Sequence, residues 1–255
     1  MNIQKVQKQQ QTQTSLGKKA INKAVEIGLS SQVEAVENLD IDIDCEPIQL
    51  AEGEVNSVKL RGEDIVMPQN LSVAEILLET DHVAINVLKA ALGKVELSQP
   101  TDASLRILLE EADLNRALQS DYLRDLIAQL TIPVGEQNLN LKIQQGKFEL
   151  SGQNRVSLEA QLLAQYGGVD YDVEFAVTLL FEAFGKRIIF EGGRYLNGKS
   201  LDFSATIALL TKVNDLLKLR TLQLSQLLVQ IERIYVAANQ ITLELQAHVE
   251  QIPEL

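Results

Sequence analysis

The sequence predicts an α+β fold in which a long, curled antiparallel β-sheet wraps around one apolar helix near the C-terminus. Several segments alternate apolar and polar residues with the period of two that is typical of β-strands. Some of these segments are longer than an average strand, which favours a strongly twisted or curled sheet. One later segment carries apolar residues around more than half of a helical circumference, so it is suited to burial against that sheet.

Residues 1–14 are predicted to form a disordered tail. They include six glutamines and few apolar residues, too few to offset the entropy that ordering the tail would cost. Ser15 is placed to cap an amphipathic helix, whose apolar face consists of Ile21, Ala24, Val25, Gly28 and Leu29. No linker rich in Pro, Gly or Ser divides the remainder of the chain, so residues 15–255 are expected to form a single domain.

The clearest strand signal lies at residues 39–45, where Leu, Ile and Cys alternate with Asp40, Asp42 and Asp44. One apolar and one polar face per strand is typical of antiparallel sheets, whereas parallel strands buried on both faces contain continuous apolar runs. A doubly wound fold is therefore excluded. The same alternation recurs at 105–109, 139–143, 156–162, 171–181 and 241–249, and the longest predicted strands are 154–164, 170–184 and 240–250.

The main predicted helix runs from Phe203 to Leu219 and is expected to be enclosed by the sheet. Shorter helices are predicted at 86–92, which ends at Gly93, and at 111–129, with an interruption near Ser120. The apolar residues of the main helix are Phe203, Ile207, Leu209, Leu210, Val213, Leu216 and Leu217.

Charge and composition exclude several partners. Lys and Arg total 23 against 35 Asp and Glu, giving a net charge of −12, and such a chain repels the phosphate backbone of nucleic acids. Cys45 is the only cysteine, so neither an internal disulfide nor a cysteine-based zinc site is expected. The N-terminus lacks an apolar run of signal-peptide length, and no later run is long enough to span a membrane. We expect a cytoplasmic protein that is able to attach peripherally to a membrane surface.

Residues 193–200, Gly-Arg-Tyr-Leu-Asn-Gly-Lys-Ser, match the phosphate-binding pattern G-x-x-x-x-G-K-[ST] in full. A working phosphate loop follows a parallel strand and leads directly into a helix. Here the surrounding strands alternate like antiparallel ones, and Leu201 and Asp202 separate Ser200 from the predicted helix. A Gly-rich turn is therefore the favoured interpretation, and a nucleotide-binding enzyme that uses Lys199 and Ser200 is the remote alternative.

The remaining polar residues suggest neither catalysis nor metal binding. Asp40, Asp42 and Asp44 share one strand face, but a calcium site usually needs a loop that bends several oxygens around the ion, so a solvated face is expected. His82 and His248 have no partner recognisable from spacing, and structural or surface roles are expected for both. The acidic residues at 110, 111 and 113 favour the positive end of the helix that begins there. We predict a protein that is not an enzyme, with no cofactor and no metal.

The long amphipathic strands and the wide apolar helix leave two interpretations of the apolar residues: an ordinary closed core, or a lipid-sized cavity between the sheet and the helix. Three stretches resemble the LmeA-like phospholipid-binding family, which was long described as a domain of unknown function and is common in cyanobacteria and actinobacteria. They are Glu52–Val58 with Leu60 and Gly62, then Gly93–Ala103 continuing to Glu111–Leu118, and the helix Ser204–Leu219 with a closing hairpin to His248–Glu250.

The resemblance covers about residues 17–252 and implies a fold similar to tubular lipid-binding domains, in which a curled antiparallel sheet wraps a long helix. It further implies non-catalytic binding or carriage of phospholipid or another acyl-chain ligand, with transient membrane contact. A structural or interaction protein with a closed core is the alternative. The expected lipid contacts are Ile207, Leu210, Val213 and Leu217 on the helix and Phe175, Val177 and Leu179 on the sheet.

Overall fold

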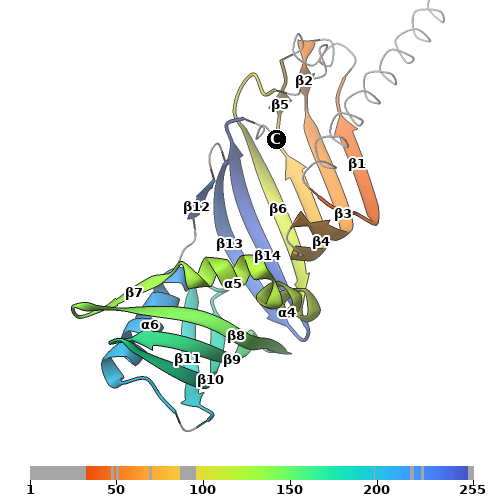
Figure 1. Ribbon diagram of the computed structural model, residues 1–255. Helices are drawn as coiled ribbons and strands as arrows, with labels where there is room; N and C mark the ends of the chain where they lie inside the picture. The colour runs from red at the N-terminus through yellow and green to blue at the C-terminus, as the bar shows by residue number, and fades with distance from the viewer. Residues whose placement is uncertain are drawn as a thin grey trace, which may run out of the picture.

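The computed structural model describes residues 33–46, 49, 52–68, 71–86, 96–197, 199–218, 221–224 and 227–251. The predicted tail, the N-terminal helix and residues 87–92 of the short helix expected at 86–92 lie outside these ranges. The larger of the two main sheets is entirely antiparallel and occupies the upper part of the molecule in Figure 1. Its strand order is β1 (Asn38–Asp44), β3 (Ser57–Met67), β4 (Leu71–Thr80), β6 (Thr101–Glu110), β14 (Gln240–Val249), β13 (Leu227–Ala237) and β12 (Thr221–Leu224).

A second antiparallel sheet lies below the first and consists of consecutive hairpin strands. Its strands include some of the longest in the chain, with 16 residues in β8 and 14 in β10. The predicted curled antiparallel sheet with long strands is therefore confirmed, although it is divided into two main parts. The strand order is β11 (Arg187–Tyr195), β10 (Val169–Glu182), β9 (Arg155–Tyr166), β8 (Gln137–Gly152) and β7 (Thr131–Val134), and a two-stranded sheet pairs β2 (Glu54–Val55) with β5 (Val83–Ala84).

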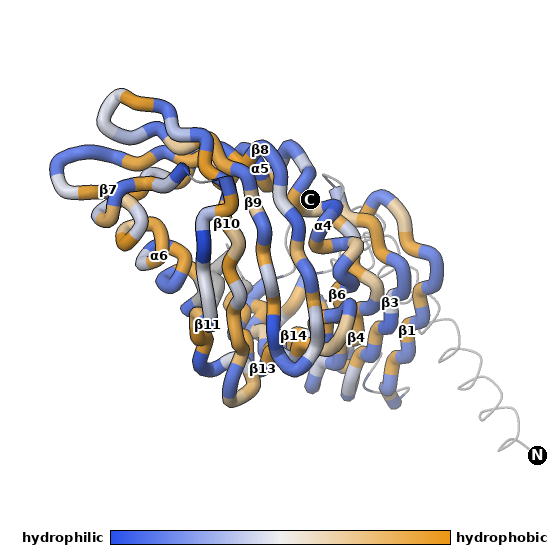
Figure 2. Tube along the Cα trace, turned by 90° about the horizontal axis from the view of Figure 1, so that it is seen from below, coloured by the Kyte–Doolittle hydropathy of each residue, from blue (hydrophilic) through white to orange (hydrophobic). Residues whose placement is uncertain are grey.

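The predicted interruption at Ser120 is confirmed. Helix α4 (Glu111–Gln119) ends and helix α5 (Asp121–Ala128) begins at this residue, whose hydroxyl donates to the Ala117 carbonyl at 2.7 Å and accepts from the Leu123 N–H at 3.3 Å. The acidic residues at the start of α4 form a capping box between Glu110 and Asp113, in agreement with the role expected for them. Figures 1 and 2 place both helices where the two main sheets meet.

Helix α6 (Phe203–Leu217) begins where Asp202 accepts a hydrogen bond from the Ala205 N–H at 2.8 Å. One side of the helix packs on the five-stranded sheet through Leu201 and Ala205, which are buried with strand residues such as Val173 and Leu139. The opposite side is exposed, so the expected enclosure of this helix by the long sheet differs from the observed arrangement. The predicted apolar breadth is present, but only part of it faces the core.

The two main sheets are joined by an apolar cluster and by backbone hydrogen bonds. Val236 of β13 packs against Leu150, Leu179 and Phe181 of the five-stranded sheet. The turn between β10 and β11 reaches the same strand, where the Ile234 N–H donates to the Phe184 carbonyl at 2.9 Å. The five-stranded sheet is therefore fixed to the lower end of the seven-stranded sheet.

Candidate functional site

The seven predicted lipid-contact residues lie in separate places. On α6, Ile207 and Leu210 are 47% and 41% exposed, Val213 is half-buried, and the side chain of Leu217 lies outside the described residues. Phe175 packs in the cluster beneath α6, together with Leu209. Val177 and Leu179 pack instead in the cluster that joins the two main sheets.

A larger apolar surface is formed by the seven-stranded sheet. The pairing register places Leu78 of β4 opposite Leu105 of β6, Leu105 opposite Leu245 of β14, and Leu245 opposite Ile231 of β13. The row continues in the other direction to Leu60 of β3 and Ile41 of β1. Because directly paired residues point to the same side of a sheet, six strands contribute one uninterrupted apolar row.

Two neighbouring rows have the same character. They are two residues away along each strand, except that a bulge between Ile231 and Arg233 places Ile234 three residues from Ile231. The pairing therefore keeps all three rows on the same side of the sheet. Together, the three rows define what we call the apolar face. The second row is Ile43, Val58, Thr80, Ala103, Ala247 and Val229, in which the Val58 N–H donates to the Thr80 hydroxyl at 2.9 Å. The third row is Leu39, Gly62, Ile76, Ile107, Leu243 and Ile234.

The apolar face is covered at its two ends. At the upper end, Ile43 is buried together with Val55 of β2 and Val83 of β5. At the lower end, Ile234 packs against the cluster that contains Leu179 and Phe181 of the five-stranded sheet. Between these ends Leu60 and Leu245 are buried. The half-buried side chains there include Ile76, Leu78, Leu105, Ile107 and Leu243. In Figure 1 the sheet is seen face-on, with α4 and α5 crossing its lower end.

The opposite face of the same sheet is polar and carries cross-strand ion pairs. Lys59 lies 2.8 Å from Glu79, and Arg233 lies 3.2 Å from Glu244. The hydrogen bond from Lys59 to Glu79, supported by the charge of that carboxylate, raises the lysine pKa above its ordinary value. His248 pairs with Asp102 at 2.7 Å on this face, a partner on the adjacent strand that sequence spacing did not indicate.

The predicted solvated face of β1 agrees with the structure, because Asp40, Asp42 and Asp44 are exposed on this polar side. Within the described ranges, no group of three His, Cys, Asp or Glu residues is arranged to hold a metal ion. His82 is exposed, and its carbonyl accepts a hydrogen bond from Thr101 at 2.9 Å.

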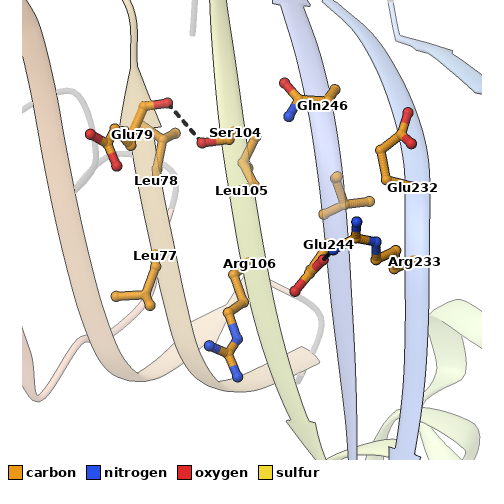
Figure 3. A pocket seen from close by; sticks show the side chains of 11 residues that line it. Leu77, Leu78, Glu79, Ser104, Leu105, Arg106, Glu232, Arg233, Glu244 and Gln246 are labelled. Atoms are coloured by element: carbon orange, nitrogen blue, oxygen red, sulfur yellow. Dashed lines mark hydrogen bonds and ion pairs between the residues drawn. The ribbon is translucent and has the colours of Figure 1, made fainter. Parts of the chain in front are cut away.

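The polar face also contains an open trough of about 420 Å³ that crosses β4, β6, β14 and β13 (Figure 3). One row of its lining is Leu77, Arg106, Glu244 and Arg233, which are paired across the strands. The trough mixes acidic, basic and apolar side chains.

The phosphate-loop motif does not form a phosphate loop. Gly193, Arg194 and Tyr195 belong to β11, where they pair with Val177, Ala176 and Phe175 in an antiparallel ladder. The backbone N–H of Lys199 donates to the Asn197 side chain at 3.1 Å, and Asp202 rather than Ser200 caps the following helix. The strand extends further than the sequence indicated, so Gly193 lies within it rather than in a turn.

No helix among the described residues combines the length and the apolar character that crossing a membrane requires. A comparison with protein families matches residues 12–246 to the family described as LmeA-like phospholipid-binding. Neither a curated protein nor a solved structure was found to match the chain.

Proposed function

Because the chain belongs to the LmeA-like phospholipid-binding family, we propose that it is a non-catalytic binder or carrier of phospholipid-like molecules. We assign the acyl chains to the apolar face of the seven-stranded sheet. The observation that carries this assignment is the row from Ile41 to Ile231, which is apolar across six neighbouring strands and half-buried at its centre.

The dimensions of the apolar face suit this ligand. Six strands spaced by about 4.8 Å give the row a length of about 24 Å, comparable to an extended acyl chain. Each methylene group that leaves water for such a surface contributes about 0.8 kcal/mol. Val177 and Leu179 pack at the lower end of this face and so are retained as proposed contacts. The helix residues Ile207 and Leu210 are exposed and do not belong to the cluster that contains Val177 and Leu179.

The first experiment asks whether the protein holds lipid at all. Purified protein is extracted with organic solvent and the extract is analysed by mass spectrometry. A short-chain fluorescent phospholipid, kept below its micelle-forming concentration, is then titrated into the protein. We expect a co-purified phospholipid and saturable binding of the probe. A protein without lipid that also fails to bind the probe would overturn the proposal and favour a closed-core structural protein.

A matched pair of variants tests the location. Leu105 and Leu77 are half-buried leucines on adjacent strands, but Leu105 belongs to the apolar face and Leu77 to the polar face. Leu105→Gln should weaken probe binding about tenfold, because the lost apolar contact contributes about 1.5 kcal/mol, whereas Leu77→Gln should leave binding unchanged. Leu105→Trp introduces bulk without charge and should also impair uptake. Equal effects of the two Gln substitutions would refute the assignment to this face.

A further inference from the structure

Helix α6 also carries apolar side chains on the side that faces away from the core. Phe203 is 81% exposed, and Ile207 and Leu210 follow it at spacings of four and three residues, so the three side chains form one stripe. The stripe faces away from the buried residues Leu201 and Ala205, and α6 lies at the margin of the molecule beside β7 in Figures 1 and 2. An exposed Phe and Ile on one helix face indicate a surface that meets a partner.

The charge around the stripe differs in sign from that of the whole chain. Residues 194–218 contain four basic residues and two acidic residues, a net charge of +2 in a chain of net charge −12. Helical spacing places Lys218 in line with Phe203 and Ile207, and the exposed Lys199 precedes the helix. Of the two acidic residues, Asp202 accepts a hydrogen bond from the Ala205 N–H as the N-cap of α6.

Helix α5 provides an instructive contrast. Its residues Tyr122 and Leu126 are 44% and 46% exposed and are also separated by one helical turn. They lie among two acidic residues, Asp121 and Asp125, and one basic residue, Arg124. An anionic surface would repel the carboxylates of Asp121 and Asp125, whereas it would attract the two lysines that flank the α6 stripe. The local charge therefore distinguishes the stripe on α6 from the exposed apolar residues of α5.

We propose that the stripe Phe203, Ile207 and Leu210 is the surface through which the protein docks on an anionic phospholipid bilayer. Helix α6 lies in the plane of the interface, its apolar side chains enter the boundary between headgroups and acyl chains, and the stems of Lys199 and Lys218 extend toward lipid phosphates. This inference rests on the proposed function to the extent that a phospholipid carrier must reach a bilayer to exchange its ligand.

Flotation of the protein with vesicles tests the surface. The vesicles contain either phosphatidylcholine alone or phosphatidylcholine with phosphatidylglycerol. Wild-type protein should bind the anionic vesicles more strongly, and added salt should weaken this binding. The double variant Phe203→Ser/Ile207→Ser should bind at least about tenfold more weakly. The matched control, Tyr122→Ser/Leu126→Ser, should bind like wild type. The melting temperature of each variant confirms that it is folded.

Three outcomes would overturn the docking surface: no vesicle binding by wild-type protein, equal loss in the two double variants, or a wild-type dimer that the α6 substitutions convert to a monomer. The last result would assign the stripe to a second copy of the chain. Titration with the monomeric fluorescent phospholipid separates this inference from the proposed function. If the α6 variant loses vesicle binding but keeps probe binding, docking and ligand binding are distinct and both proposals are supported.

Discussion

The junction between the two main sheets depends on Gly185, and its replacement by alanine should be unusually costly. Gly185 has a φ of +78° and lies in the turn between β10 and β11. An alanine Cβ at this position would lie 2.8 Å from the Cβ and 3.1 Å from the Cγ1 of Ile234. Because a Cβ atom is attached directly to the backbone, no side-chain rotation of Ile234 relieves the closest contact. The turn and β13 would have to separate.

Gly168→Ala is the matched control. Gly168 has a similar φ of +76° in the turn between β9 and β10, but nothing lies within 4 Å of the position that an alanine methyl group would occupy there. Both substitutions incur about 1–2 kcal/mol for a left-handed alanine. Gly185→Ala adds about 1–3 kcal/mol of overpacking and about 1 kcal/mol if the hydrogen bond from Ile234 to Phe184 is lost. The difference between the variants is therefore expected to be about 2–4 kcal/mol.

Equilibrium unfolding in urea, followed by circular dichroism, measures this difference. The free energy of unfolding of both variants should depend on urea concentration as steeply as in the wild type. The urea concentration at the midpoint of unfolding should be much lower for Gly185→Ala than for Gly168→Ala. If the two free energies of unfolding agree within about 0.5 kcal/mol, the contact between the turn and Ile234 does not hold the sheets together as described.

A surface ion pair, a helix cap and the phosphate-loop motif can each be tested by a separate measurement. Hydrogen bonds from the Arg155 guanidinium hold the pKa of Glu191 below its ordinary value. This pair therefore stabilises the fold above the ordinary carboxyl pKa, and that contribution is lost as pH falls through the folded-state pKa. The difference in free energy of unfolding between wild type and Glu191→Gln, measured in urea, should shrink toward acidic pH, and a pH-independent difference would contradict the assignment. Asp202→Ala removes the N-cap of α6 and should destabilise the protein by about 1 kcal/mol, whereas Asp202→Asn should retain most of the stability in the same urea assay. ATP or GTP with Mg²⁺ should leave the melting temperature unchanged, because Gly193 is paired within β11; an increase would restore the nucleotide-binding interpretation.

The sequence predicted those elements whose signal is local. Alternation of polar and apolar residues located β1, β9, β10 and β14, and a capping serine with acidic neighbours located the break between α4 and α5. In each case the residues that carry the pattern also make the local hydrogen bonds or face one side of the element. Neither long-range pairing nor strand order was needed.

Other strands were missed because their patterns are interrupted. In β3, Gly62 breaks the apolar alternation and Asp64 has a positive φ of 50°. In β4, consecutive apolar residues at Ile76, Leu77 and Leu78 conceal the period of two. In β13, a bulge between Ile231 and Arg233 shifts the alternation by one residue. The apolar face could not be predicted because it exists only once these strands are paired.

The main helix illustrates a different limit. Its wide apolar circumference was recognised and was assigned to burial, yet Leu201 and Ala205 face the five-stranded sheet while Phe203 and Ile207 face outward. Residue type alone does not distinguish an apolar side chain that meets its own core from one that meets a partner. Exposure and the surrounding charge make that distinction here.

The lack of charged side chains on the apolar face limits how a phospholipid is able to lie on it. The three rows contain no charged side chain across six strands, and the hydroxyl of Thr80 is engaged with the backbone of Val58 at 2.9 Å. A phosphate group placed among these residues would lose its hydration without gaining a partner, which is far more costly than any acyl contact could offset. The acyl chains must therefore occupy the rows while the headgroup remains hydrated at an edge of the sheet. Substitutions in the rows should consequently affect probes with different headgroups alike, and selectivity among headgroups should depend on residues at the edges.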